Sequence, residues 1–358
     1  MGFGFVIFLA LWIAGFLAMF VSYAPVTEKY LKTLNFKLYM LPFPYILLYF
    51  ACGSIGAYFL TDNNDFIEPI TVLRIALPII LAAAIYLMSM LSVRWLFAVL
   101  VTVCVSAVVL IQPIGGGSAF PSLPIWLIQA LTIIFGVIYC LGYGIMNSTP
   151  QALIIPSVMT LFGLCILSGI GAAPIYSAFA AAVFMGALVA YLGVNFHADK
   201  IDLDNGACTA VPFLIFSLLV LQLGEFSFPS CMVFTTVFWA ELAFALWHKY
   251  VVSRTGTLQE NTNYYLAGLH LDFTALGLNI SKICIITLFL GWFQLFSVNH
   301  YSLFLIAWVI ALWLNCSLGQ NEVSPQGIKE INREFVKNLK QSIKEAKDVI
   351  NQSRHKED

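Results

Sequence analysis

The feature that most constrains the fold is a series of apolar runs, each close to twenty residues long. A helix needs about 20 apolar residues to cross the hydrocarbon core of a bilayer, whereas barrel strands alternate over about ten. The runs therefore predict an all-α polytopic membrane protein of about eleven transmembrane helices. The predicted spans are 3–24, 39–60, 70–91, 95–111, 125–146, 152–170, 175–194, 207–224, 230–248, 277–297 and 301–318.

Composition agrees with this class of fold. Charged residues make up 10% of the chain and hydrophobic residues 61%, whereas a soluble domain carries about 25% charged residues. So few charges cannot cover a surface that faces water, and the bilayer is expected to be the main solvent. The first run lacks a basic flank, so we interpret it as a span and not as a cleaved signal peptide. We expect no nucleic-acid partner.

The ends of the predicted spans are marked by helix-breaking residues. Examples are Pro25, the acidic stretch 62–65, the glycine run 115–118, Pro150, and the segment 171–174 that ends in a proline. The eight cysteines occur singly and form no CxxC pair, which argues against a zinc site or a disulfide framework. They are Cys52, Cys104, Cys140, Cys165, Cys208, Cys231, Cys284 and Cys316.

Basic residues predict the orientation, because they remain on the cytoplasmic side. With eleven spans and the N-terminus outside, nearly all basic residues fall inside, and of the seventeen Lys and Arg only Arg74 lies towards the outside. The outer loops then carry Asp62, Asp65, Glu68 and Glu225. We therefore predict an N-terminus outside and a C-terminus in the cytoplasm.

Two parts of the chain differ in kind. Residues 1–320 form the predicted transmembrane domain, and residues 321–358 form a charged cytoplasmic tail. Within the tail, apolar residues recur at helical spacing over 328–350, which predicts an amphipathic helix. This helix would lie on the membrane surface or pair with a protein partner. The alternative is a solubilising tail folded back on the protein's own loops.

The loop at 195–206 carries an unusual density of polar groups for this chain. Asp202 and Asp204 could share a divalent cation, since hard cations prefer oxygen ligands, and Lys200 could meet a phosphate as a point charge. The alternative is a solvated polar turn.

Two further places on the predicted inner side are candidates. Glu241 lies within the ninth span, where an acid is a functional candidate by default, although it could instead be a structural partner for another helix. The inner loop 249–276 is the longest and contains His270 and Asp272. Long loops are often functional, but a single histidine is more often structural than a metal ligand.

The motif residues resemble those of the polyprenyl-phosphate N-acetylhexosamine-1-phosphate transferase family, most clearly over residues 125–300. The family has a loop that reads roughly N-F-x-P-A-K-I-F-x-G-D-x-G, and this chain matches much of it if one residue is deleted before Asp204. The family also has an acid in a later span, then a basic pair, and a Gly-Leu further on. The matching residues are Asn195, Phe196, Lys200, Ile201, Asp204, Gly206, Glu241, His248, Lys249, Gly277 and Leu278.

The resemblance implies a ten- or eleven-span enzyme of a bacterial inner membrane with a cytoplasmic active site. Such an enzyme transfers a sugar phosphate from a nucleotide sugar to polyprenyl phosphate with the help of Mg²⁺. Of the family's metal-binding acids, Asp204 alone persists in a matching position. The resemblance and the polar loop at 195–206 together give candidate catalytic positions, substrate-binding positions and two metal ligands. These are Asp204, Asp202, Asn147 and His270 as catalytic, Asn195, Lys200, Gly206 and Glu241 as substrate-binding, and Asp204 and Asp202 as Mg²⁺ ligands.

This chain departs from the family where the family carries most of its acids. An Asp-Asp pair belongs at the inner end of the third span, where this chain has Met88-Ser89-Met90. Asn147 and Pro150 stand where two aspartates of another motif belong, and of a His-x-His-His motif at most His270 remains. Phosphoryl transfer needs a metal ion held by carboxylates and substrate phosphates. We therefore expect impaired or lost catalysis, with Mg²⁺ as a cofactor only if the protein is active.

Three functional hypotheses follow. The first is a divergent transferase-like protein of envelope-glycan synthesis that binds polyprenyl phosphate with little or no catalysis. The second is an active enzyme whose metal site is rebuilt from Asp199, Asp202 and Asp204 with Glu241 or Asp272. The third is a transporter or membrane scaffold of another fold; proline-interrupted spans favour it, and the lack of a visible inverted repeat counts against it.

Overall fold

The structure is a computed structural model that describes residues 2–22, 42–61, 69–89, 94–111, 124–145, 150–169, 175–195 and 205–223, together with isolated residues between 235 and 309. The described residues form eight α-helices and contain no strand. The helices are α1 (Gly2–Ser22), α3 (Pro42–Thr61), α4 (Pro69–Ser89), α5 (Arg94–Ile111), α6 (Ile125–Ile145), α7 (Pro150–Gly169), α8 (Ile175–Asn195) and α9 (Asn205–Leu223).

These helices confirm the all-helical prediction over the described part of the chain. Each coincides with one of the first eight apolar runs, and every end agrees to within three residues. Proline begins three of them, at Pro42, Pro69 and Pro150. Proline suits the first position of a helix, because its missing N–H would have no partner there anyway and its backbone angle is already helical. The predicted spans after residue 224 and the tail 321–358 lie largely outside the described residues.

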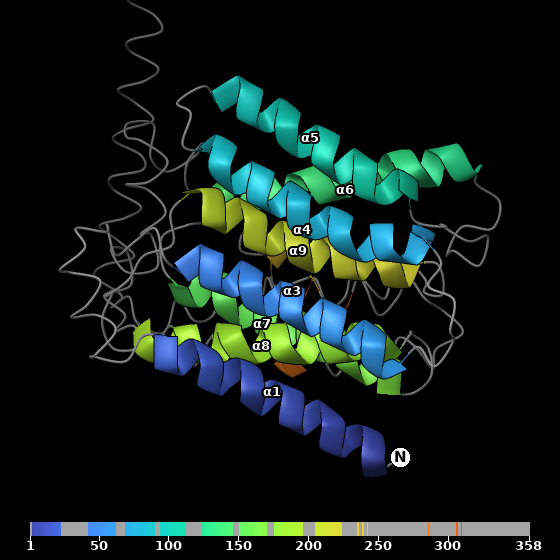
Figure 1. Cartoon of the computed structure of the whole chain (residues 1–358). Helices are drawn as coiled ribbons and strands as arrows, with labels where there is room; N and C mark the ends of the chain where they lie inside the picture. Colours follow the sequence, from blue (N-terminus) through green and yellow to red (C-terminus); the bar gives the residue numbers. More distant parts are fainter. Residues whose placement is uncertain are drawn as a thin grey trace, which may run out of the picture.

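The helices lie side by side in one bundle, with α1 and α5 at opposite edges (Figure 1). One group surrounds α8, which contacts α1, α3 and α7. A second group surrounds α9, which contacts α4 and α6, while α5 packs on α6 and α4. The two groups meet where α3 contacts α4 and where α9 contacts α7 and α8.

The two central helices are buried on every side. All described side chains of α8 from Ala178 to Leu188, and of α9 from Gly206 to Val220, are buried. Buried alanines are frequent in α8, and small residues let helix backbones approach closely. The closest approach is to α1: a Cβ added at Gly186 would meet the backbone of Trp12 and Phe16, and one added at Gly15 would meet the backbone of Val183.

Hydroxyl groups within the helices mostly bond to their own helix. Seven donate to the carbonyl three or four residues earlier at 2.6–2.9 Å, so each of these donors is satisfied within its own helix. They are Ser89, Thr102, Ser106, Thr132, Ser157, Thr160 and Ser217.

Apolar side chains also cover much of the outer surface of the bundle. On α5, Trp95 is 70% exposed, Val103 58% and Leu110 62%, and outward apolar residues also occur on α1, α3, α4 and α6. Two stretches, Val72–Ser89 and Ile125–Tyr143, are long and apolar enough by length and composition to cross a membrane. The other apolar helical stretches of the described residues are shorter.

Candidate functional site

The structure describes two of the predicted site residues. Asn195 is the last residue of α8, and Gly206 is the second residue of α9. The others lie outside the described residues, so their roles stay predictions. These are Asn147, Asp199, Lys200, Asp202, Asp204, Glu241, His270 and Asp272. Within the described part of the chain, no three His, Cys, Asp or Glu residues are grouped as metal ligands.

Gly206 lies directly against the end of α4. A Cβ added at Gly206 would fall on the side chain of Ser89, 2.7 Å from its Cβ, and 3.2 Å from the carbonyl oxygen of Tyr86. The Ser89 hydroxyl donates a hydrogen bond of 2.6 Å to that same carbonyl. The beginning of α9 and the end of α4 are therefore in contact, and only a glycine fits at this point.

This contact brings together two segments that are far apart in the sequence, the end of α4 and the start of α9. Gly206 closes the loop 195–206, and Ser89 lies in the segment where we predicted that an Asp-Asp pair is missing. They are 117 residues apart in the chain but adjacent in space. The hydroxyl of Ser89 is neutral and donates to its own helix, so it does not replace a carboxylate as a metal ligand.

Residues around Glu241 pack on α6. Phe238 contacts two tyrosine rings of α6, with centroid distances of 4.6 Å to Tyr139 and 4.4 Å to Tyr143. A Cβ added at Gly142 would lie 2.7 Å from the Phe238 ring and 3.0 Å from Leu242. Leu242, which follows Glu241 in the sequence, thus lies beside the last turns of α6. In the sequence, α6 ends at Ile145, two residues before Asn147.

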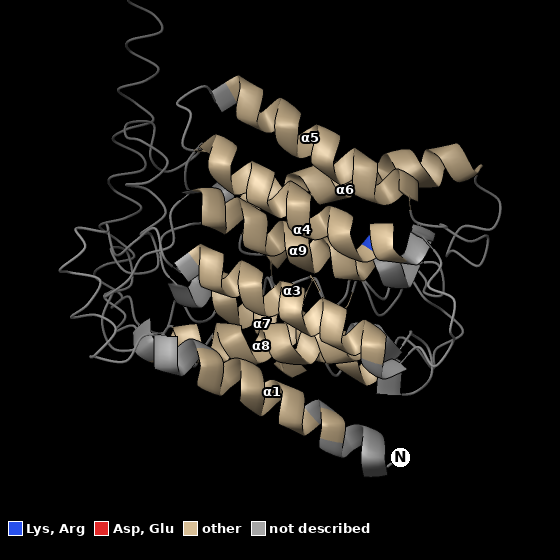
Figure 2. Cartoon of the chain, viewed as in Figure 1, with Lys and Arg blue, Asp and Glu red and all other residues tan. Residues whose placement is uncertain are grey.

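A second polar place lies inside the bundle, and the sequence analysis did not identify it as a site. Arg74 is the sixth residue of α4 and the only charged residue whose side chain the structure describes (Figure 2). It lies about 8 Å along the helix from its start, at a rise of about 1.5 Å per residue. Its Nε atom is buried and has no hydrogen-bond partner among the described residues.

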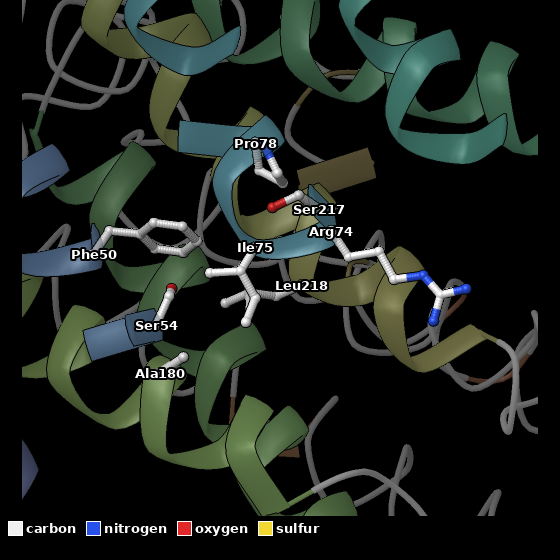
Figure 3. Close-up of a pocket in the computed structure, with 8 residues that line it drawn as sticks. All are labelled: Phe50, Ser54, Arg74, Ile75, Pro78, Ala180, Ser217 and Leu218. Carbon is white, nitrogen blue, oxygen red and sulfur yellow. The ribbon is translucent and has the colours of Figure 1, made fainter. Parts of the chain in front are cut away.

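Beside Arg74 is a small cavity at the meeting of the two helix groups. Its volume is about 10 Å³, and its lining comes from α3, α4, α8 and α9. Ser54 is 5% exposed, and its Oγ has no hydrogen-bond partner among the described residues. Figure 3 shows the guanidinium group of Arg74 directed away from Ser54. The lining residues are Phe50, Ser54, Arg74, Ile75, Pro78, Ala180, Ser217 and Leu218.

The lining determines what chemistry this cavity supports. It contains hydroxyl groups and a cationic residue, but no carboxylate, histidine or cysteine. Such a set can hydrogen-bond a small polar molecule, but its serines have no histidine or carboxylate beside them in the lining to act as a general base. The sequence did carry a signal for this place, namely a single arginine in an apolar run with Pro78 four residues later.

No family model matches the chain, and no curated protein matches it. The transferase resemblance therefore depends on the motif residues themselves.

Proposed function

We propose that the chain is an eleven-span protein of a bacterial inner membrane, with its N-terminus outside and its charged tail in the cytoplasm. Several observations support this. Two helices have the length and composition of spans, and the outer face of α5 exposes large apolar side chains. Hydroxyls such as those of Thr102 and Ser106 on α5 are exposed yet bonded to their own helix, which suits a surface that faces lipid.

On this scaffold we infer a transferase-like function in which a polyprenyl phosphate binds on the cytoplasmic side. The observation that carries this inference is the contact between Gly206 and Ser89. It brings the start of α9 to the end of α4, as a shared pocket requires. The loop 196–204 joins α8 to α9 and contains Lys200 and Asp204, which are our candidates for the lipid phosphate and its counter-ion.

The same contact supports weak or absent catalysis. A transferase of this class needs Mg²⁺ between the phosphates of the nucleotide sugar, held by carboxylates. At the end of α4 this chain presents Ser89, whose hydroxyl is bonded to Tyr86. Removing a group that stabilises transition-state charge costs about 3–4 kcal/mol, or 10²–10³ in rate. Several such losses together would leave a lipid-binding protein with little transferase activity.

Native mass spectrometry of the purified full-length protein tests the lipid site. We expect a retained polyprenyl phosphate that is lost in the Lys200→Ala and Asp204→Ala variants. Lys29→Ala, which removes a predicted cytoplasmic lysine from a different loop, should retain the lipid. An unchanged lipid signal in the first two variants would reject the site.

Catalysis is tested separately with radiolabelled nucleotide sugars, undecaprenyl phosphate and Mg²⁺ in purified membranes. We expect no lipid-linked product across a panel of sugars. Product that disappears in Asp204→Ala would establish instead an active enzyme with a rebuilt metal site.

Transport is the second candidate function, and Arg74 favours it. A charged residue inside a membrane bundle commonly marks a path for ions or substrates, and Arg74 lies where the two helix groups meet. Solute flux into liposomes that is lost in both Arg74→Gln and Glu241→Gln would replace the lipid-binding proposal with this one.

A further inference from the structure

The starting point is a break in the hydrogen bonding of α4. Pro78 lies inside this helix, and proline has no N–H to donate. The carbonyl of Arg74, four residues earlier, therefore lacks its normal helical donor. Inside a membrane such a carbonyl must find another donor, from a neighbouring side chain, a local change in helix geometry, or an ordered water.

A donor without a partner lies on the neighbouring helix. The hydroxyl of Ser54 on α3 is buried, and none of the described residues bonds to it. It differs in this from the seven hydroxyls that donate to their own helix, such as Ser217 on α9, which bonds to Leu214 at 2.7 Å. A buried hydroxyl without a hydrogen bond costs about 1–3 kcal/mol, so Ser54 also needs a partner.

Both residues line the cavity between α3, α4, α8 and α9 (Figure 3). Its volume of about 10 Å³ is close to the minimum that holds one water molecule, and a buried water needs two to four polar partners. Ser217 supplies a third, because its oxygen donates to Leu214 and can still accept. Apart from the Arg74 guanidinium, which is directed away from Ser54 (Figure 3), the remaining lining is apolar.

We propose that this cavity binds one ordered water that bridges the Ser54 hydroxyl and the carbonyl that Pro78 leaves free on Arg74. A cation fits less well because Arg74 is positively charged, and an anion fits less well because the free carbonyl is the negative end of a dipole. The water would give the Arg74 carbonyl a donor in place of the missing N–H of Pro78 and tie α4 to α3, across the junction of the two helix groups.

A double-mutant cycle on the full-length protein in lipid nanodiscs tests this role. Ser54→Ala should lower Tm by about 2–4 °C, the shift expected when about 1 kcal/mol of hydrogen bonding is lost. Pro78→Ala restores an N–H that can bond to the Arg74 carbonyl. In that background the shift caused by Ser54→Ala should fall by half or more. Ser106→Ala is the control, because its hydroxyl bonds to its own helix on α5, and its effect should be equal in both backgrounds.

A high-resolution cryo-EM map of the unmutated protein gives a second, independent reading. We expect a density peak within about 2.7–3.2 Å of Ser54 Oγ, the distance of a hydrogen bond. Two results would overturn the proposal: an empty cavity, or a Ser54→Ala variant whose Tm is unchanged or higher than that of the unmutated protein. Equal Ser54→Ala shifts in the two backgrounds would also overturn it. If Pro78→Ala fails to fold, the map alone decides.

Discussion

Replacing Gly186 with alanine tests the close contact of α1 with α8. The added Cβ would lie 2.9 Å from the backbone nitrogen of Phe16 and 3.1 Å from the carbonyl carbon of Trp12, and closer still to the Trp12 carbonyl oxygen. Optimal carbon contacts are about 3.5–4.0 Å. All three atoms belong to the backbone, so no side chain can rotate away, and α1 must move outwards by roughly 0.5–1 Å.

The loss of stability follows from this displacement. A well-packed side chain makes about 40–60 atom contacts of about 0.1–0.2 kcal/mol each, and a gap of about 0.5–1 Å removes a quarter to a half of each. If the displacement of α1 weakens the contacts of one buried side chain in this way, the loss of packing energy is roughly 2–4 kcal/mol. Trp12 and Phe16 both pack against the core from α1, so we expect the free energy of unfolding to fall by about this amount.

The matched control is Gly193→Ala, on the same helix. A Cβ at Gly193 would have no atom within 4 Å, and alanine favours a helix over glycine by about 1 kcal/mol. Gly193→Ala should therefore leave stability unchanged or raise it.

The assay is reversible unfolding in detergent or bicelles, combined with cysteine crosslinking between α1 and α8. If Gly186→Ala were as stable as Gly193→Ala and crosslinked normally, the reasoning about glycine contacts would be wrong.

Three further predictions follow from other parts of the bundle. Val103→Asp on the exposed face of α5 should raise the free energy of membrane insertion by about 2.5–3.5 kcal/mol, measured with a glycosylation reporter; no effect would contradict a lipid-facing surface. Gly206→Ala should lower polyprenyl-phosphate retention in native mass spectrometry, and Ser89→Gly should restore it, because the added Cβ meets the Ser89 side chain. Gly142→Ala should lower Tm less than Gly186→Ala does, since the Cβ would meet side-chain atoms of Phe238 and Leu242; an equal or larger loss of Tm would show that these side chains cannot adjust.

The lengths and ends of the helices were predictable because they depend on local chemistry. Continuous apolar runs predict where helices form, and prolines such as Pro69 and Pro150 mark where helices begin. Which helices lie at the centre of the bundle and which at its edge was not predictable in the same way. In lipid, an outward valine such as Val103 and a buried one such as Val211 have the same hydrophobicity.

For the candidate sites, too, the sequence identified individual residues but not their neighbours in space. The sequence singled out Gly206 as part of a motif, and the structure adds that Ser89 is its neighbour. That contact depends on how α4 and α9 pack, which no local pattern contains. Arg74 was noticed only for its charge, because its relation to Ser54 likewise depends on the packing of α3 against α4.

The hydroxyls that bond to their own helices have a consequence for how this protein tolerates change. Since Ser157 already donates to a carbonyl of α7 and Thr132 to one of α6, these hydroxyls contribute little adhesion between helices. Close packing, and not hydrogen bonding between helices, must then hold the bundle together. The bundle should therefore accept the replacement of a polar side chain by an apolar one of similar size. Serine-to-alanine changes should accumulate freely at the positions whose hydroxyls bond to their own helix, but not at Ser54, whereas a single added methyl group at Gly15 or Gly186 should be selected against.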